Sequence, residues 1–484
     1  MGYEKKDPSQ NFNRLRRGFD LSGGVTCKGC FEKKLEIDEL KAKIVRLQAQ
    51  VRHAQKIKKK DIAGAHTPSS KVAFKKNSAK DERGKKGGAK AGHKGHGRKR
   101  ASLSDADEII EPETHGQECG DCGGRLHCLG VRERSIVEAM PIKAKRVLYR
   151  IARFRCSGCR KVTETKPPLV ARQLYGDRLL SQAATMHYVH GVPIGRLLAI
   201  FGPNVTEGGI IQAFHRLGRI CERAIPGLTE QYRKSPVRHA DETGWRNDGH
   251  SGYAWLFGTA DVSILEFANT RSSRIPRKMV GDDVLPGVLV VDRYAAYNRL
   301  PVQLQYCYAH LLREVERLES EFNEEREVTA FASAFIPLLT QAMKLRTLPI
   351  GDSEFYRRAG AVKAEIIRLA RTTTFRHLAI KRVQQIFCDN EARLYHWAKS
   401  RDVPADNNRA ERELRPTVIA RKVSFGSQSD AGTRTRSALM SVLFTARKRL
   451  PRNVAIEDWF KNAIDQIAKD PSKNILDLLP PPAS

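Results

Sequence analysis

Two aspartates stand at the ends of apolar, strand-like segments, and the sequence first suggests chemistry there. Asp241 ends the apolar part of 237–245 (VRHADETGW), and Asp292 ends the apolar part of 287–297 (GVLVVDRYAAY). Neighbouring strands can bring two such carboxylates within a few ångströms of each other. Carboxylate oxygens suit Mg²⁺, which keeps waters for itself and for substrate phosphates. Asp241 and Asp292 are therefore candidates for a cation site, although strand-end aspartates also commonly cap turns.

Phosphoryl transfer assisted by two cations needs a third carboxylate. The best candidate lies in 406–416 (DNNRAERELRP), where Asn407 or Asn408 is suited to cap a helix. That cap would place Glu411 on the first turn or two. Glu413 is two residues on, roughly 200° around the helix, so only one of the two can face the metals. Spacing alone leaves Glu411 and Glu413 as alternatives for the third carboxylate.

Cysteine pairs indicate a second kind of metal site. Two Cys-x-x-Cys knuckles, CGDC and CSGC, flank a segment that alternates like a strand over 131–154. Two knuckles joined by a β-hairpin make a zinc ribbon, and four thiolates supply the closed tetrahedron of structural zinc. The alternative is four reduced thiols in a core, against which the glycine-rich knuckles argue. Cys27 and Cys30 have no second pair nearby, so their role stays open. The predicted zinc ligands are Cys119, Cys122, Cys156 and Cys159.

Charge and composition narrow the class of protein. The 484 residues carry a net charge of +32, and 40% are hydrophobic, which favours folded domains that bind a polyanion. Ten cysteines are too few for a disulfide scaffold. No run approaches ~18 consecutive apolar residues, and the N-terminus lacks the apolar core of a signal peptide. We therefore expect a soluble, intracellular protein with no membrane partner.

The N-terminal hundred residues hold 28 Lys+Arg and 10 Asp+Glu. The segment 67–100 is rich in Gly, Lys and Ser, so we interpret it as a disordered linker. It is either a solubilising tether or an arm that contacts DNA phosphates through Lys94, Arg98, Lys99 and Arg100. Before it, a helix is predicted within 31–60. Apolar residues recur along one side of this helix at heptad spacing, and we call this row the seam. It predicts either a helix that packs on the protein's own core or a dimerisation helix. The seam consists of Ile37, Leu40, Ile44, Leu47 and Val51.

The middle of the chain predicts helices followed by a sheet. Segment 176–225 has helical periodicity broken at 191–193 and 203–209, which fits a helix-turn-helix or a plain helical connector. Gln212, His215 and Arg216 would be exposed on its last helix. Short strands then follow, and a helix begins near 311, an α/β pattern with a mixed sheet. The expected strands after 237–245 are 253–260, 262–270, 287–297 and 304–310.

Taken together, these motifs resemble the IS66-type insertion-sequence transposases. The two cysteine knuckles match in order and spacing, and the resemblance covers most of the chain from about 65 to 450. Two positions depart from the pattern, since Arg293 follows Asp292 and Tyr308 replaces a more usual Trp. The resembling segments are GHKGHGR (92–98), HADETGWRNDGHSGYAWLF (239–257), GVLVVDRYAAYNRL (287–300), CYAHLLRE (307–314) and NNRAERELRPTVIARKVSFGS (407–427).

The resemblance implies an RNase H-like DDE fold in which Asp241, Asp292 and Glu411 are catalytic and bind Mg²⁺ or Mn²⁺. It implies DNA cleavage at the element's ends and strand transfer, with DNA as partner. Glu242 would point to the opposite face of its strand and bind no metal. We interpret Cys307 and His310 as supports of the site. Basic residues near Glu411 would contact phosphates or form surface ion pairs; they are Arg412, Arg415, Arg421 and Lys422.

The predicted organisation is α/β: an RNase H-like DDE catalytic domain with a helical insertion, preceded by a zinc ribbon, a helix-turn-helix-like segment and a coiled-coil helix. Alternative functions are a non-catalytic DNA-binding protein on a degenerate nuclease fold, or a nuclease without strand transfer. We also expect a homo-oligomer, small accessory proteins encoded by the same element, and a nucleoid-associated location in a bacterium or archaeon. The boundaries are 1–64 for the N-terminal region, 65–104 for the basic linker, 105–172 for the zinc ribbon, 173–232 for the helical segment, 233–450 for the catalytic domain with its insertion at about 320–400, and 451–484 for the tail.

Overall fold

The computed structural model describes residues 121–125, 142, 144–164 and 174–482, and part of a helix between residues 33 and 50. It divides into two compact units, considered separately here. The first unit comprises residues 1–72, which include the N-terminal helix, and residues 227–418. The second unit comprises residues 73–226 and 419–484. Some predictions fall outside the described residues: Cys27, Cys30, Val51, Lys94, Arg98, Lys99, Arg100 and Cys119.

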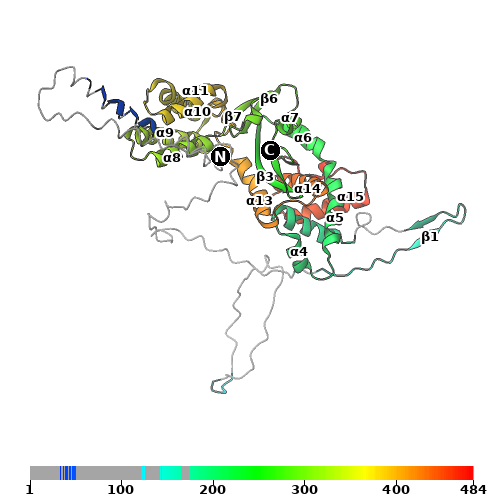
Figure 1. Cartoon of the computed structure of the whole chain (residues 1–484). Helices are drawn as coiled ribbons and strands as arrows, with labels where there is room; N and C mark the ends of the chain where they lie inside the picture. Colours follow the sequence, from blue (N-terminus) through cyan, green and yellow to red (C-terminus); the bar gives the residue numbers. More distant parts are fainter. Residues whose placement is uncertain are drawn as a thin grey trace, which may run out of the picture. The chain divides into compact units, whose positions relative to one another are not determined.

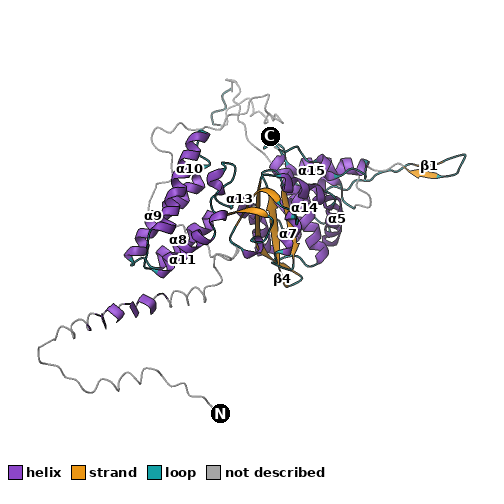
Figure 2. Cartoon of the chain, turned by 90° about the horizontal axis from the view of Figure 1, so that it is seen from above, coloured by secondary structure: helices purple, strands orange, loops and turns teal. Residues whose placement is uncertain are grey.

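The first unit is built on a five-stranded mixed sheet with the order β5-β4-β3-β6-β7. β3 pairs antiparallel with β4 and parallel with β6, while β4–β5 is antiparallel and β6–β7 is parallel. Helices pack around this sheet (Figures 1 and 2). The strands are β3 (Val237–Asn247), β4 (His250–Gly258), β5 (Ser263–Ala268), β6 (Leu285–Val291) and β7 (Val302–Tyr306).

Local sequence explains the central strands. A two-residue turn joins β3 to β4, where Asp248 and Gly249 have φ of 49° and 74°. Asp-Gly is favoured there because both positions need positive φ. Residues 254–257 of β4 and 288–291 of β6 are all buried, as expected of strands covered on both faces. β3, which carries Asp241, pairs with both of these strands, and Asp292 directly follows β6, so the sheet core holds the backbone of both aspartates in place.

Helices of the first unit flank the sheet and form the insertion. The predicted helical insertion at 320–400 is observed as a bundle in which α9 packs against α8 and α10 (Figure 1). The helices are α6 (Ile225–Lys234), α7 (Arg274–Val280), η6 (Ala295–Tyr297), α8 (Tyr308–Glu321), α9 (Arg326–Leu345), α10 (Asp352–Ile367), η7 (Arg368–Thr372), α11 (Leu378–Asp389), η8 (Glu391–Arg393), α12 (His396–Lys399) and α13 (Asn408–Ser424).

One of these helices, α9, is long and apolar enough to cross a membrane by length and composition alone. Its Phe331, Phe335 and Leu339 are buried, and the ring of Phe335 lies 5.0 Å from that of Phe387 in α11. The apolar face of α9 is therefore covered by the bundle. This placement agrees with a core helix of the insertion.

The second unit is helical. α14 lies beside α5, although more than 200 residues separate them in sequence (Figures 1 and 2). The helices predicted within 176–225 are observed, with breaks at 190–193 and 202–206. The elements are α3 (Asp177–Ala184), η5 (Thr185–Val189), α4 (Ile194–Phe201), α5 (Glu207–Glu222), α14 (Asp430–Arg449), α15 (Ile456–Lys469) and η9 (Ile475–Leu478).

A short hairpin precedes these helices. β1 (Arg153–Arg155) pairs antiparallel with β2 (Val162–Glu164), and the CSGC knuckle forms the turn between them. The prediction of a strand reaching back through 144–152 is wrong, because no strand is assigned there. Strand structure needs a paired neighbour, and the observed pairing extends over only three residues on each side of the knuckle.

Candidate active site

Asp241 and Asp292 occupy equivalent positions on neighbouring strands. β3 and β6 run parallel with His239 opposite Val290, so each aspartate stands two residues beyond that pair. Side chains two residues apart point to the same face of a strand, and adjacent strands lie about 4.8 Å apart. The two carboxyl groups therefore belong to equivalent positions on neighbouring strands. The prediction that Asp241 ends its strand is wrong, because antiparallel pairing with β4 carries β3 on to Asn247. Asp292 follows the last residue of β6, as predicted.

Both of these carboxyl groups have raised pKa values, although the charges of Arg271 and Arg293 lower that of Asp292. Burial raises the pKa of Asp241 well above its ordinary value, and the charges of Glu242, Asp292 and Glu411 raise it further. Burial and then the charge of Glu242 raise the pKa of Asp292 to about 7. Two backbone N–H groups oppose these shifts, from Glu242 to Asp241 Oδ1 (3.0 Å) and from Tyr294 to Asp292 Oδ1 (2.9 Å).

Glu411 is brought to the aspartates by a buried asparagine. Asn407, immediately before α13, donates from Nδ2 to the Ala240 carbonyl (2.8 Å), and its Oδ1 lies 2.8 Å from His239 Nδ1. Its backbone N–H donates to Cys307 Sγ at 3.1 Å. Asn407 thus fastens the start of α13 to β3, one residue from Asp241. The side chain that was expected to cap the helix instead joins the helix to the sheet.

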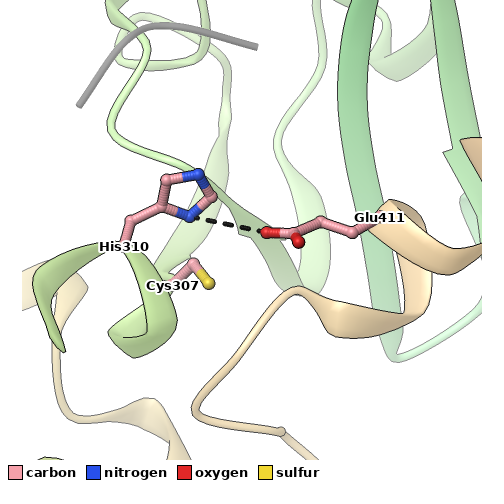
Figure 3. A group of neighbouring side chains, drawn as sticks. All are labelled: Cys307, His310 and Glu411. Atoms are coloured by element: carbon pink, nitrogen blue, oxygen red, sulfur yellow. Dashed lines mark ion pairs between the residues drawn. The ribbon is translucent and has the colours of Figure 1, made fainter. Parts of the chain in front are cut away.

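The face of α8 holds the Glu411 carboxylate (Figure 3). Arg313 Nη2 lies 2.9 Å from Glu411 Oε1, and His310 Nδ1 lies 3.8 Å from the same oxygen. Cys307, His310 and Glu411 place one ligand atom each within 4.8 Å of one another. The buried sulfur of Cys307 accepts the Asn407 N–H, a contact that agrees with the predicted supporting role. Cys307 is the N-cap residue of α8, and His310 and Arg313 follow at intervals of three residues, so these three side chains share one face of the helix.

A second buried cluster supports the site through Glu242, whose side chain is almost fully buried. Arg271 donates to Glu242 Oε1 from Nη2 (2.5 Å) and Nε (3.0 Å), and Tyr297 donates to Oε2 at 2.6 Å. The Arg271 guanidinium lies 3.8 Å from the ring centroid of Tyr294, whose hydroxyl donates to the Arg271 carbonyl. Both oxygens of Glu242 are thereby engaged, and the segment following Asp292 is tied to the same cluster.

We predict that Arg271→Met destabilises the first unit by about 3–5 kcal/mol, because it leaves the Glu242 carboxylate buried without its cation. Urea unfolding of the full chain would measure the loss. The matched control is the double variant Arg271→Met/Glu242→Gln, which removes both charges and should recover most of the stability. A single-variant loss below about 1 kcal/mol would contradict this account.

The two departures from the family pattern are accommodated locally. Arg293 pairs with Glu314 on α8 (2.6 Å), and its charge also lowers the pKa of Asp292. Tyr308 is fully buried, donates to the Leu394 carbonyl (2.7 Å) and packs edge-on against Trp397 at 5.8 Å. Neither substitution therefore disturbs the carboxylates.

The predicted DNA contacts on α13 differ in exposure. Arg412 directly follows Glu411 and Arg415 lies about one turn beyond it; both are exposed and belong to the same unit. Lys422 is exposed and Arg421 is half-buried, and both belong to the second unit. The structure therefore groups only Arg412 and Arg415 with the carboxylates.

The described cysteines of the knuckles are Cys122, Cys156 and Cys159, and all three are exposed free thiols. Backbone N–H groups of Cys159 and Gly158 lower the pKa of Cys156, aided by the Cys159 side chain. N–H groups directed at sulfur favour the thiolate, which is the form that binds metal.

Sequence spacing missed several residues of the site. His239, Arg271 and Arg313 act through partners 168, 29 and 98 residues away, respectively. His239 stands on the same face of its strand as Asp241, two residues earlier, which was the one local signal available. The contacts of Arg271 and Arg313 depend on tertiary structure.

Three carboxylates beside a mixed five-stranded sheet indicate the class of protein, because this arrangement is consistent with the RNase H-like fold of DDE transposases. The family model described as "Transposase IS66 family" matches residues 172–435. The chain belongs to the IS66 family of transposases, and this membership implies DNA processing related to transposition.

Two relatives come from Sinorhizobium fredii (strain NBRC 101917 / NGR234). The uncharacterized protein y4qI is 25% identical over 424 residues, covering 78% of this chain and 76% of that protein. The uncharacterized protein y4hP is 23% identical over 418 residues, covering 77% and 74%. The likeness thus extends well beyond the sheet and its insertion.

Proposed function

We propose that the chain cleaves a phosphodiester bond at each end of its insertion sequence and transfers the freed end to target DNA. The observation that carries the proposal is electrostatic. Burial and the charge of Glu242 raise the pKa of Asp241 most, and the charges of Asp292 and Glu411 raise it further, which supports a convergence of all three carboxylates. Excess negative charge of this kind is stabilised by cations.

The donor set fits a hard divalent cation. Asp241, Asp292 and Glu411 offer carboxylate oxygens, the ligands that Mg²⁺ or Mn²⁺ prefers. When bound, Mg²⁺ would supply Lewis acidity that activates the attacking oxygen and stabilises the leaving one. Glu242 has both oxygens occupied by Arg271 and Tyr297, which supports leaving it out of the ligand set.

The chain's own residues position the reactants. Water attacks the phosphorus at the element's end, and the broken P–O bond releases a 3′-hydroxyl. That hydroxyl attacks a target phosphorus in line, and the target's own 3′-oxygen leaves. Arg412 and Arg415 are exposed near Glu411 and would contact phosphates on either side of the reacting one.

We also propose that Cys119, Cys122, Cys156 and Cys159 bind one structural zinc ion. The N–H groups directed at Cys156 support this ligand role. Metal analysis tests it, since Cys156→Ser should lower the zinc content of the purified chain by about one equivalent. Equal zinc in the variant and the wild type would exclude the ribbon.

Self-association is a further part of the proposal. The apolar residues Ile37, Leu40, Ile44 and Leu47 of the N-terminal helix are all exposed, which supports its use as a dimerisation seam.

The deciding experiment incubates the purified chain with Mg²⁺ and a DNA carrying the element's inverted repeats, with a repeat-free DNA as control. We expect nicking at the repeat boundary, followed by joined products that contain target DNA. Nicking without joining would favour the nuclease alternative. Binding without either reaction would favour the non-catalytic DNA-binding alternative, and both outcomes would reject strand transfer.

A further inference from the structure

The second unit contains a cavity of about 450 Å³ between α5 and the first turns of α14. It is open to solvent and has room for about fifteen water molecules. The two helices approach closely at one edge of it, where a Cβ on Gly218 would lie 3.1 Å from the Thr435 Cα. Glycine at this position therefore sets the helix spacing that leaves the cavity.

The cavity has a net positive lining. Arg219 projects from α5 and Arg434 from α14, and both side chains are exposed. Glu222 supplies the one carboxylate of the lining, so the charged groups sum to a single positive charge when His215 is neutral. Gln212 adds an exposed amide that can donate hydrogen bonds.

His215 is held in the wall by the opposite helix. Its Nδ1 lies 2.7 Å from Thr435 Oγ1, a contact that fixes the ring against α14. Burial and the charge of Arg219 lower the pKa of His215, which keeps the ring neutral at pH 7. The cavity therefore combines two guanidinium groups on separate helices with fixed neutral polar groups between them.

We propose that this cavity binds a backbone phosphate of DNA, with Arg219 and Arg434 as its two cationic contacts. Guanidinium groups match the geometry of phosphate oxygens. The single net positive charge balances the one negative charge of a phosphodiester and suits the multiple charges of a free nucleotide poorly. The inference rests on the proposed function only in naming DNA as the polyanion. The contact positions the duplex and reads no base sequence.

Salt-dependent binding of the full-length chain to DNA tests the proposal. The probe is a fluorescent duplex, measured by anisotropy over a series of salt concentrations. Each lost phosphate contact should reduce the magnitude of the slope of log K against log salt by about 0.9, so Arg219→Gln/Arg434→Gln, which removes the contact to one phosphate, should reduce it by about 0.9. The loss should be equal for duplexes with and without the inverted repeats. Gln212→Glu, which adds a carboxylate to the cavity, should also weaken binding.

A matched control removes the same charge elsewhere in the unit. Arg447 and Arg452 are exposed beyond the cavity, and Arg447 lies about 20 Å further along α14 than Arg434. The double variant Arg447→Gln/Arg452→Gln should keep the wild-type slope. An unchanged slope in the cavity variant, or an equal fall in the control, would overturn the inference.

Binding of inorganic phosphate tests whether the ligand of the cavity is a phosphate of the DNA backbone or a small free phosphate. We expect no saturable phosphate binding by calorimetry below about 10 mM, because a single phosphate lacks the other backbone contacts. Tight phosphate binding that the cavity variant loses, with an unchanged DNA slope, would assign the cavity to a small ligand and overturn the inference. Cleavage is not needed in these assays. A chain that shows the predicted slopes but never cuts DNA would contradict only the proposed function.

Discussion

Asp292→Asn should abolish DNA nicking and joining while making the chain more resistant to heat near neutral pH. The variant loses an anionic oxygen that we propose as a cation ligand. The transition-state stabilisation that would depend on this ligand is several kcal/mol, so we expect activity to fall about 10³-fold. Nicking assays with Mg²⁺ measure the loss. More than about a tenth of wild-type activity remaining would show that Asp292 is not a cation ligand.

The expected gain in heat resistance follows from the raised pKa of Asp292, which is about 7 against an ordinary value of 3.8. Between these two values the folded chain keeps a proton that the unfolded chain has released. The unfolding free energy therefore falls as pH rises through this window, by up to about 1.4 kcal/mol per pH unit for one group. The stabilising contribution of the protonated form is complete below pH 3.8 and is lost as pH passes 7.

Melting temperatures of the variant and the wild type, measured without divalent cations, test this dependence. Their difference should be small near pH 4 and should grow in favour of Asp292→Asn towards pH 8. Adding Mg²⁺ should then raise the wild-type melting temperature selectively, since cation binding stabilises only the chain that retains the ligand. A difference that stays constant with pH would contradict the raised pKa.

Glu411→Gln and Glu413→Gln form the second decisive pair. Glu411 lies against His310 and Arg313, and its charge contributes to the raised pKa of Asp241. Glu413 instead accepts a hydrogen bond from Ser263 (2.8 Å), which a glutamine can retain. We expect Glu411→Gln to lose about 10³-fold in cleavage. Glu413→Gln should stay within about threefold of the wild type.

Both glutamine variants keep the size and the polar head of the side chain, so the helix should remain folded in each. Their circular dichroism and their affinity for DNA serve as controls. The reverse result, with Glu413→Gln inactive and Glu411→Gln active, would mean that the third ligand has been misassigned.

Local patterns predicted the parts of the fold that are themselves local. The apolar runs of β4 and β6 are visible in the sequence, and the helices of 176–225 follow from periodicity and breaks. Asp292 was placed correctly because β6 stops at Val291. Asp241 was placed at a strand end incorrectly, because the continuation of β3 depends on pairing with β4.

The residues that position the ligands could not be predicted in the same way. Asn407 carries the sequence signature of a helix cap, and only the tertiary structure shows it bonded to His239 and Ala240 on β3. Likewise, the Cys307 and His310 spacing was noticed, but its neighbour Glu411 is about 100 residues further along the chain. Spacing describes neighbours along one element, whereas this site joins several elements.

The bond between His239 and Asn407 closes a loop of 168 residues. During synthesis, both aspartates leave the ribosome long before the helix that carries Glu411, and the whole insertion must emerge in between. A polypeptide that stops between residues 292 and 407 therefore contains two of the three carboxylates and lacks the residue that joins α13 to β3. If the proposed site is correct, a chain terminated before Glu411 should be unable to cut DNA, so the proposed activity should belong only to molecules translated beyond α13.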